Sequence, residues 1–219
     1  MIVDNLNSRE ERLEMVDMDE EHKRIRTILV LGAPGSGKGT QGRIMGAIPG
    51  FFHLACGDVF RSLDTTSELG STFLQYSSQG KLVPDQSTIQ LWLDHIQGRE
   101  QTGDFRPDDE ILVLDGIPRN RAQAEMMSDY IDVIRLIFLE AADQSQLVER
   151  LRRRALHENR LDDASESVIR QRLLEYESHT APLLDYYSSD VLGRVDAGWQ
   201  PIDVLRDVIE IVQEALSGQ

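Results

Sequence analysis

Cysteine and long apolar segments are both scarce in this chain of 219 residues. A single cysteine, Cys56, rules out an internal disulfide and fits a reducing compartment. No apolar run approaches the roughly 20 residues that a membrane-spanning helix needs. The first residues also lack the basic-then-apolar pattern of a secretory signal. We therefore expect a cytoplasmic protein with no membrane partner.

Positive charge is scarce as well, with 23 lysines and arginines against 38 acidic residues and a net charge of −15. Nucleic acids and anionic membranes both bind basic surfaces, so this balance argues against either partner. Only three of the basic residues are lysines, and seven of the arginines lie between residues 150 and 172. The planar guanidinium suits bidentate phosphate binding, so the local cluster predicts a small polyphosphate ligand. A solvated helix face would have a similar composition.

Short apolar runs rich in Ile, Val, Leu or Phe recur along the chain and have the length of buried parallel strands. They are residues 27–31, 51–54, 111–115, 134–139 and 191–195, and helices are expected at 58–65, 68–79, 85–98, 120–130, 143–156, 165–187 and 201–216. The alternation predicts an α/β fold, a five-stranded parallel sheet with helices on both faces. Ligands of such sheets bind beyond the carboxyl ends of the strands, here near residues 32, 55, 115 and 140. The connection from 55 to 110 exceeds one crossover helix and predicts an inserted subdomain.

A glycine-rich run at residues 32–40, Gly-Ala-Pro-Gly-Ser-Gly-Lys-Gly-Thr, directly follows the apolar residues 28–31 and precedes a segment that can start a helix. Glycines let the backbone fold tightly, so that several N–H groups and the positive end of the helix dipole point at one anion. Lys38 adds a full charge placed to reach the β- and γ-phosphates of a nucleotide. The run therefore predicts a phosphate-binding loop rather than an unliganded turn.

Further motifs follow this loop along the chain. They are His-Leu-Ala-Cys-Gly-Asp-Val-Phe-Arg at 53–61, Gly-Lys-Leu-Val-Pro-Asp at 80–85, Asp-Gly-Ile-Pro-Arg at 115–119 with Asn-Arg-Ala-Gln-Ala-Glu after it, Arg-Leu-Asp-Asp at 160–163, and Thr-Ala-Pro-Leu-Leu-Asp-Tyr-Tyr at 180–187. In this order and at these spacings they resemble the adenylate kinase family of nucleoside monophosphate kinases, over about residues 27–216.

The resemblance implies a P-loop kinase with an inserted monophosphate-binding subdomain at about residues 56–85 and a short lid at about 152–162. Residues 1–24 would precede this domain as a frayed helix or disordered extension. The lid segment has neither the length nor the four cysteines of a zinc-binding lid, so we expect no structural zinc. We further expect a monomer whose partners are the nucleotides ATP and AMP.

Members of this family move the γ-phosphoryl group of ATP to a nucleoside monophosphate with Mg²⁺ present. The acceptor oxygen is already ionised, so the reaction needs positioning and charge stabilisation rather than a general base. The resemblance assigns catalysis to Lys38, Arg119, Arg154, Arg160 and Arg172, with the register within residues 152–154 open by one residue. It assigns ATP binding to Gly35, Ser36, Gly37, Lys38, Gly39, Thr40, Arg150, Arg154 and Gly198. It assigns Mg²⁺ binding to Thr40 and Asp115, with water between these residues and the ion.

The same resemblance places AMP against Cys56, Arg61, Lys81, Leu82, Val83, Gly116, Ile117, Pro118, Arg119, Gln123, Arg160 and Arg172. The amide of Gln123 can donate and accept at once, as reading the adenine edge requires. Cys56 stands where the family has threonine, and losing that hydrogen bond would cost about 0.5–1.5 kcal/mol. Ile117 replaces a phenylalanine near the base. Both departures weaken the preference for AMP, so a UMP/CMP kinase or a kinase of broader monophosphate specificity remains an alternative.

Two further interpretations stay open at this point. A small-molecule kinase on a similar fold, such as one for a sugar acid, would leave Gln123 and the 80–85 motif unexplained. A nucleotide-binding regulatory protein without turnover belongs to another class, and the intact lysine, aspartate and arginines argue against it. Cys56 could serve a redox reaction, but a small buried or substrate-facing side chain is the expected role. We assign no role to His157, in the expected lid loop, and interpret His53 as structural.

Overall fold

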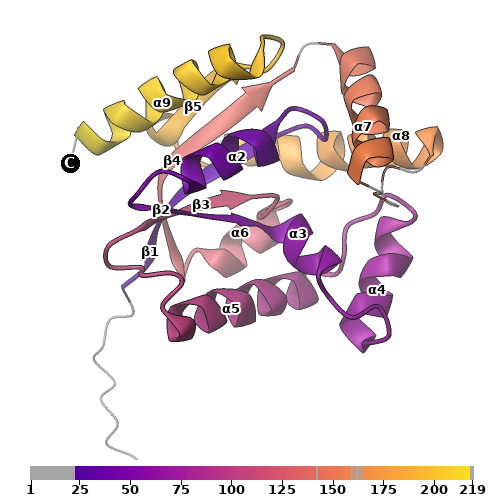
Figure 1. Cartoon of the computed structure of the whole chain (residues 1–219), viewed down its shortest axis with the longest axis horizontal. Coiled ribbons are helices and arrows are strands. Elements are labelled where there is room, and N and C mark those ends of the chain that lie inside the picture. The colour runs from indigo at the N-terminus through magenta and orange to yellow at the C-terminus, as the bar shows by residue number, and fades with distance from the viewer. Residues whose placement is uncertain (1–22, 142, 159, 161–162, 164, 218–219) are drawn as a thin grey trace, which may run out of the picture.

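The core of the protein is a parallel β-sheet, seen in a computed structural model that describes residues 23–141, 143–158, 160, 163 and 165–217. The extension expected at residues 1–24 lies outside this part except for its last two residues. The strands are β1 (Ile25–Gly32), β2 (Phe51–Ala55), β3 (Ile111–Asp115), β4 (Ile131–Glu140) and β5 (Leu192–Asp196), in the order β2-β3-β1-β4-β5 and all parallel (Figure 1). The expected five-stranded parallel sheet is confirmed.

Helices cover both faces of this sheet because each strand points successive side chains to opposite sides. In β1, Ile28 and Val30 pack into a cluster with residues of α2 (Lys38–Gly46) and α9 (Pro201–Ser217). The neighbouring Leu29 and Leu31 belong to a second cluster with residues of α5 (Asp85–Thr102) and α6 (Arg121–Met127). Figure 1 shows α2 and α9 on one side of the sheet and α5 and α6 on the other.

Four further helices lie beyond the carboxyl ends of the strands (Figure 1). They are α3 (Cys56–Arg61) and α4 (Glu68–Ser77), which precede α5, and α7 (Gln144–Glu158) and α8 (Glu166–Glu175), which follow β4. Helices α7 and α8 share a small core of their own, made by Leu147, Leu151, Ile169 and Leu173. The carboxyl ends of the strands therefore face two separate pairs of helices.

The helix expected at 85–98 continues as α5 to Thr102. Gly98 sits inside it, and the helix ends at Gly103, whose φ of 76° is the left-handed conformation that glycine adopts without strain. At 18 residues α5 is the longest of the helices that the structure describes, and charged side chains are distributed among its apolar residues. Within the described residues, no helix combines the length and the apolar character needed to cross a membrane.

The single helix expected at 165–187 is divided in the structure. Helix α8 ends at Glu175, a π-helical turn covers Tyr176–Thr180, and a 3₁₀ turn follows at Ala181–Asp185. Pro182 has no backbone N–H and cannot continue a regular α-helical ladder. His157 also differs from expectation, because it lies in the last turn of α7 rather than in a loop.

Candidate active site

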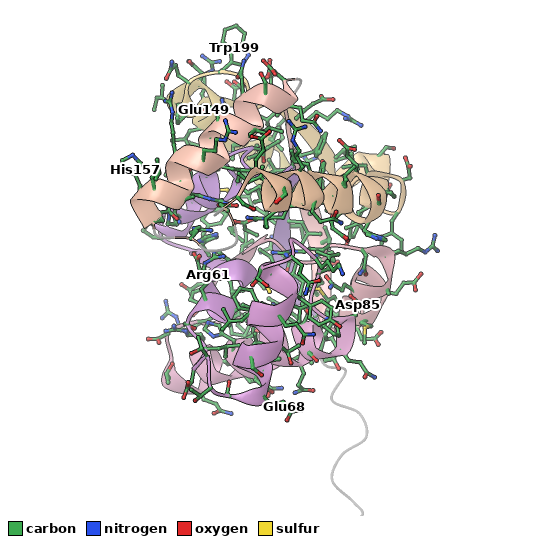
Figure 2. The ribbon with its side chains drawn as sticks, turned by 90° about the vertical axis from the view of Figure 1, so that its right-hand side faces the viewer. Arg61, Glu68, Asp85, Glu149, His157 and Trp199 are labelled. Atoms are coloured by element: carbon green, nitrogen blue, oxygen red, sulfur yellow. The ribbon has the colours of Figure 1, made fainter. Side chains whose placement is uncertain are left out.

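A cavity of about 760 Å³ lies where β1, β2 and β3 end and extends to α7 and α8. With one exception, every residue that the sequence assigned to the site lines this cavity. The exception is Ile117, whose side chain is fully buried in the hydrophobic cluster that includes α5 and α6 residues. Among the expected strand ends, Gly32, Ala55 and Asp115 line the cavity and Glu140 does not. Figure 2 labels Arg61 between α7 and α4, on the side of the molecule where these helices meet the sheet.

The phosphate loop takes a backbone conformation that requires glycine at two positions. Gly35 and Gly37 have φ values of 85° and 100°, and Gly37 caps the N-terminus of α2. A Cβ atom at Gly35 would also come within 2.9 Å of the Leu147 carbonyl oxygen. The hydroxyl of Ser36 is buried and has no hydrogen-bond partner among the described residues. A buried, unsatisfied donor beside a helix N-terminus fits a loop that binds phosphate oxygens.

Lys38 lies over the phosphate loop that precedes it. Its Nζ donates to the carbonyl oxygens of Gly32 and Ala33, at 2.8 and 3.0 Å. Burial lowers the pKa of the ammonium from 10.5 to about 8, and the Asp115 carboxylate opposes this shift only in part. The nearby Arg119 acts in the same direction as burial. An anionic ligand in the cavity would therefore relieve an unfavourable concentration of positive charge.

Asp115 ends β3 and is buried, with only 8% of its surface exposed. Its Oδ2 lies 3.4 Å from the position that a Cβ on Gly39 would occupy, so the carboxylate faces the start of α2. Thr40 is exposed one residue further along the helix. In the described part of the chain, no three His, Cys, Asp or Glu side chains form a cage for a metal. Oxygen donors of this kind fit Mg²⁺, which commonly binds one or two carboxylates together with water and substrate phosphates.

Two arginines of the helical pair α7 and α8 share one buried acid. Arg154 donates from Nε and Nη2 to Oδ2 of Asp163, at 2.9 and 2.5 Å, and Arg172 donates from Nη1 to Oδ1. The Asp163 side chain is fully buried, while Arg154 and Arg172 keep 28% and 19% of theirs exposed. Both guanidinium groups line the cavity. The acid therefore holds two cations in place without removing them from the cavity wall.

On the α3 side, Asp58 connects two more arginines. Arg61 Nη2 donates to its Oδ1 at 2.5 Å, and Nη2 of Arg160 lies 3.6 Å from the same oxygen. Partial burial acts to raise the pKa of Asp58, but the hydrogen bond and charge of Arg61, with the charge of Arg160, outweigh it and lower the pKa. Arg160 also donates from Nε to Glu158 at 2.6 Å. The ionised carboxylate thus holds Arg61 and Arg160 near each other in the cavity wall.

Arg119 is fixed at both its backbone and its side chain. Its Nε donates to the Gly116 carbonyl oxygen at 2.8 Å, and its own carbonyl oxygen accepts from Thr180 Oγ1 at 2.7 Å. Its backbone N–H donates to Oε1 of Gln123 at 2.8 Å. Gln123 has only 1% of its surface exposed and still lines the cavity. The motif at 115–119 and the start of α6 therefore form one hydrogen-bonded unit.

Cys56 lies at the junction of β2 and α3 with 2% of its surface exposed. Burial raises the pKa of its thiol to about 11, and the positive charge of Arg119 only partly opposes this. The thiol is therefore protonated at neutral pH and is a poor nucleophile. This agrees with a small buried side chain in the cavity wall and argues against a redox role.

In another part of the cavity wall, Arg150 of α7 donates from Nη1 to the Ala197 carbonyl oxygen at 3.0 Å. The next residue, Gly198, donates its N–H to Oδ1 of Asp196 at 2.8 Å. These two bonds hold the loop after β5 against α7. Trp199 follows in this loop with 63% of its surface exposed, and it too lines the cavity.

Adenylate kinase is the family whose sequence model matches this chain, over residues 30–192. The chain belongs to the adenylate kinase family. It is 35% identical over 195 residues to the adenylate kinase of Leuconostoc mesenteroides, an alignment that covers 85% of this chain and 97% of the relative. Identity to the adenylate kinase of Thermobifida fusca is 32% over 195 residues, covering 87% and 96%. The adenylate kinase of Phocaeicola vulgatus is 32% identical over 201 residues, covering 85% and 98%.

Several residues of this adenylate kinase family member were not assigned to the site from the sequence. Asp58 and Asp163 stand inside the motifs quoted at 53–61 and 160–163, but neither was assigned a role in the site. Their carboxylates were a usable signal, because a carboxylate within a cluster of arginines is the natural partner of the guanidinium groups. Thr180 and Trp199 gave no such signal, since their role depends on how distant segments meet.

Proposed function

We propose that the protein is an Mg²⁺-dependent adenylate kinase that interconverts ATP and AMP with two molecules of ADP. One observation carries this proposal: a single cavity is lined both by the phosphate loop and by Arg61, Arg119 and Gln123. A donor triphosphate and an acceptor monophosphate can therefore meet in the same enclosure. Membership of the adenylate kinase family supports this assignment.

The donor half would consist of Gly35, Ser36, Gly37, Lys38, Gly39 and Thr40 around the phosphates, with Arg150 and Gly198 near the adenine. Arg61 and Arg119 would bind the acceptor phosphate. Arg154, Arg160 and Arg172 line the same cavity, where they would stabilise charge on the transferring group. The acceptor oxygen is ionised at neutral pH, so these cations provide positioning and charge stabilisation without a general base.

Asp115 and Thr40 would hold Mg²⁺ together with phosphate oxygens and water. When bound, the ion would neutralise charge on the donor phosphates. Asp115 is well suited to this role because its carboxylate is buried beside the start of α2, close to the lysine of the phosphate loop.

We also propose that residues 56–85 form an AMP-binding subdomain and residues 152–162 a short lid, and that both close during the reaction. Closure would exclude water, which would otherwise accept the phosphoryl group. The carboxylate of Asp58 supports this proposal, because Asp58 and its partner Arg61 belong to the first segment and Arg160, which approaches the same oxygen, belongs to the second. Residues 159, 161 and 162 of this lid lie outside the described part of the chain.

A panel of acceptors under matched conditions tests the proposal. ATP and Mg²⁺ are incubated with AMP, UMP, CMP or GMP, and diphosphate formation is followed by chromatography. We expect the highest kcat/KM with AMP. Equal or faster turnover with UMP or CMP would overturn the base assignment, and no turnover with any monophosphate would favour a silent nucleotide-binding protein.

The location and assembly of the protein are separate proposals. The single cysteine supports a cytoplasmic location, and the completeness of the cavity within one chain supports a monomer. Sedimentation at micromolar concentration would test the monomer, since a dimer would sediment as twice the chain mass of 24.8 kDa.

A further inference from the structure

The side-chain amide of Gln123 is held at both ends by protein atoms. Its Oε1 accepts from the backbone N–H of Arg119 at 2.8 Å, and its Nε2 donates to Oδ1 of Asp85 at 2.7 Å. Asp85 is the first residue of α5 and is labelled in Figure 2. The amide therefore lies between a fixed donor and a fixed acceptor.

These two partners leave the amide a single orientation. Rotation by 180° would place the NH₂ group against the Arg119 N–H and the carbonyl oxygen against the Asp85 carboxylate. Both contacts would be repulsive, because a backbone N–H only donates and an ionised carboxylate only accepts. Asp85 is held in turn by Asn120, whose Nδ2 donates to the same Oδ1 at 2.8 Å, and by the positive end of α5.

The amide still has hydrogen-bonding capacity for a ligand. Each end makes one bond to the described residues, which leaves one N–H on Nε2 and one lone pair on Oε1. Because Gln123 lines the cavity, a base at this position meets a donor and an acceptor in a fixed order. A 6-aminopurine offers an acceptor at N1 and a donor at its 6-amino group. A 6-oxopurine offers the reverse, a donor at N1 and an acceptor at O6.

We propose that Asp85 is a positioning residue that makes the acceptor site select 6-aminopurine over 6-oxopurine monophosphates, by locking the amide of Gln123 in one orientation. The inference rests on the proposed function, in which the cavity end beside Gln123 holds the acceptor base. Without the carboxylate only the Arg119 N–H would oppose the turned amide, so a 6-oxopurine would bind with a smaller penalty. A site with a fixed order of donor and acceptor instead leaves two buried groups unpaired against the wrong base.

AMP and inosine monophosphate provide the test, because they differ only at this edge of the purine. The change Asp85→Asn keeps the shape of the side chain but lets it either donate to or accept from Gln123. The change Asp85→Ser does the same with a smaller group, in case the first variant fails to fold. Asp94→Asn is the matched control, since it removes the same charge from an exposed position on the same helix.

We expect the wild-type ratio of kcat/KM for AMP over inosine monophosphate to be on the order of 100 or more. Asp85→Asn and Asp85→Ser should lower this ratio at least about tenfold, mainly through faster turnover of inosine monophosphate, while the KM for ATP and the control ratio stay the same. An unchanged ratio, or an equal loss with both acceptors, would overturn the role of Asp85. Failure of the wild type to phosphorylate AMP would instead overturn the proposed function, so the two failures are distinguishable.

Discussion

Arg154 binds the buried carboxylate of Asp163 through both Nε and Nη2. Arg172 binds the second oxygen of the same carboxylate, so two cations of the cavity wall depend on one acid. Because the acid is fully buried, water does not balance its charge, and among the described residues these two guanidinium groups do so. The position of both arginines is thus tied to a residue that does not itself line the cavity.

Asp163→Asn should reduce both stability and turnover. The amide cannot balance two guanidinium groups, so we expect a loss of about 1–3 kcal/mol in the free energy of unfolding. Misplaced arginines should lower kcat on the order of 10- to 100-fold. Urea unfolding and steady-state kinetics measure the two effects, with Asp129→Asn as an exposed control. Normal kcat in Asp163→Asn would show that the arginines hold their positions without the acid.

The lowered pKa of Lys38 predicts a fall of activity at mildly alkaline pH. In the free enzyme the ammonium loses its proton as pH rises through about 8, and phosphate binding loses its charge with it. A plot of log kcat/KM for ATP should therefore decline above this pH, towards a slope of −1. The decline in kcat should come at higher pH, because bound phosphates raise the pKa of the lysine. A flat profile up to pH 10 would contradict this role.

The lowered pKa of Lys38 also makes the stability of the folded protein depend on pH. In the unfolded chain Lys38 keeps the ordinary pKa of 10.5, so between about pH 8 and 10.5 the unfolded state binds more protons than the folded state. The contribution of this residue to stability therefore rises with pH in that window. Lys38→Met removes the effect, so its stability advantage over the wild type should shrink between pH 7 and pH 10 in urea unfolding.

The helix behind the phosphate loop packs so closely on β2 that a single methyl group should disturb it. A Cβ on Gly46 would lie 2.4 Å from Cβ of His53 and 3.0 Å from its backbone nitrogen. Gly46→Ala should therefore cost about 1–3 kcal/mol, although alanine is the better helix former. Gly98→Ala in α5 is the matched control, since nothing lies within 4 Å of its added Cβ. That variant should gain about 0.5–1 kcal/mol.

Cys56 should react slowly with alkylating reagents in the native protein. With a pKa of about 11, only about a thousandth of the thiol is ionised at pH 8. Mass spectrometry should show far slower labelling by iodoacetamide than in the urea-unfolded chain. Rapid native labelling would contradict the burial of the thiol. Where labelling does occur, loss of AMP binding with ATP binding retained would place the residue in the acceptor half.

Much of the fold is predictable because local pattern and tertiary structure agree. The apolar runs at 27–31 and 111–115 form buried strands, since a strand covered on both faces needs no polar alternation, and the run at 51–54 forms the partly buried edge strand β2. Strand β4 begins at Ile131, earlier than expected at 134, because Asp132 interrupts the apolar pattern while the backbone pairing with β1 continues. Such pairing depends on the neighbouring strand, which a single run of sequence does not contain.

The residues of the site, like the fold, can be predicted from the sequence only in part. The phosphate loop and the strand-end motifs identify the residues that line the cavity, but Ile117 lies in the core despite its place between Gly116 and Pro118. Its direction depends on how residues 115–119 turn away from β3. The bonds from Asp85 to Gln123 and from Asp163 to Arg154 are equally beyond sequence reasoning, because they depend on which side chains meet after α5, α6, α7 and α8 have packed.

The separate four-residue core between α7 and α8 implies an uneven distribution of local stability. These helices bury few apolar groups against the main clusters, so their amides should exchange with deuterium as one cooperative unit ahead of the sheet. The unit carries Arg150, Arg154 and Arg172, and a nucleotide that binds these arginines would stabilise the folded form of the unit. Added nucleotide should then slow the exchange of this unit by mass action, so that its local stability follows the nucleotide concentration.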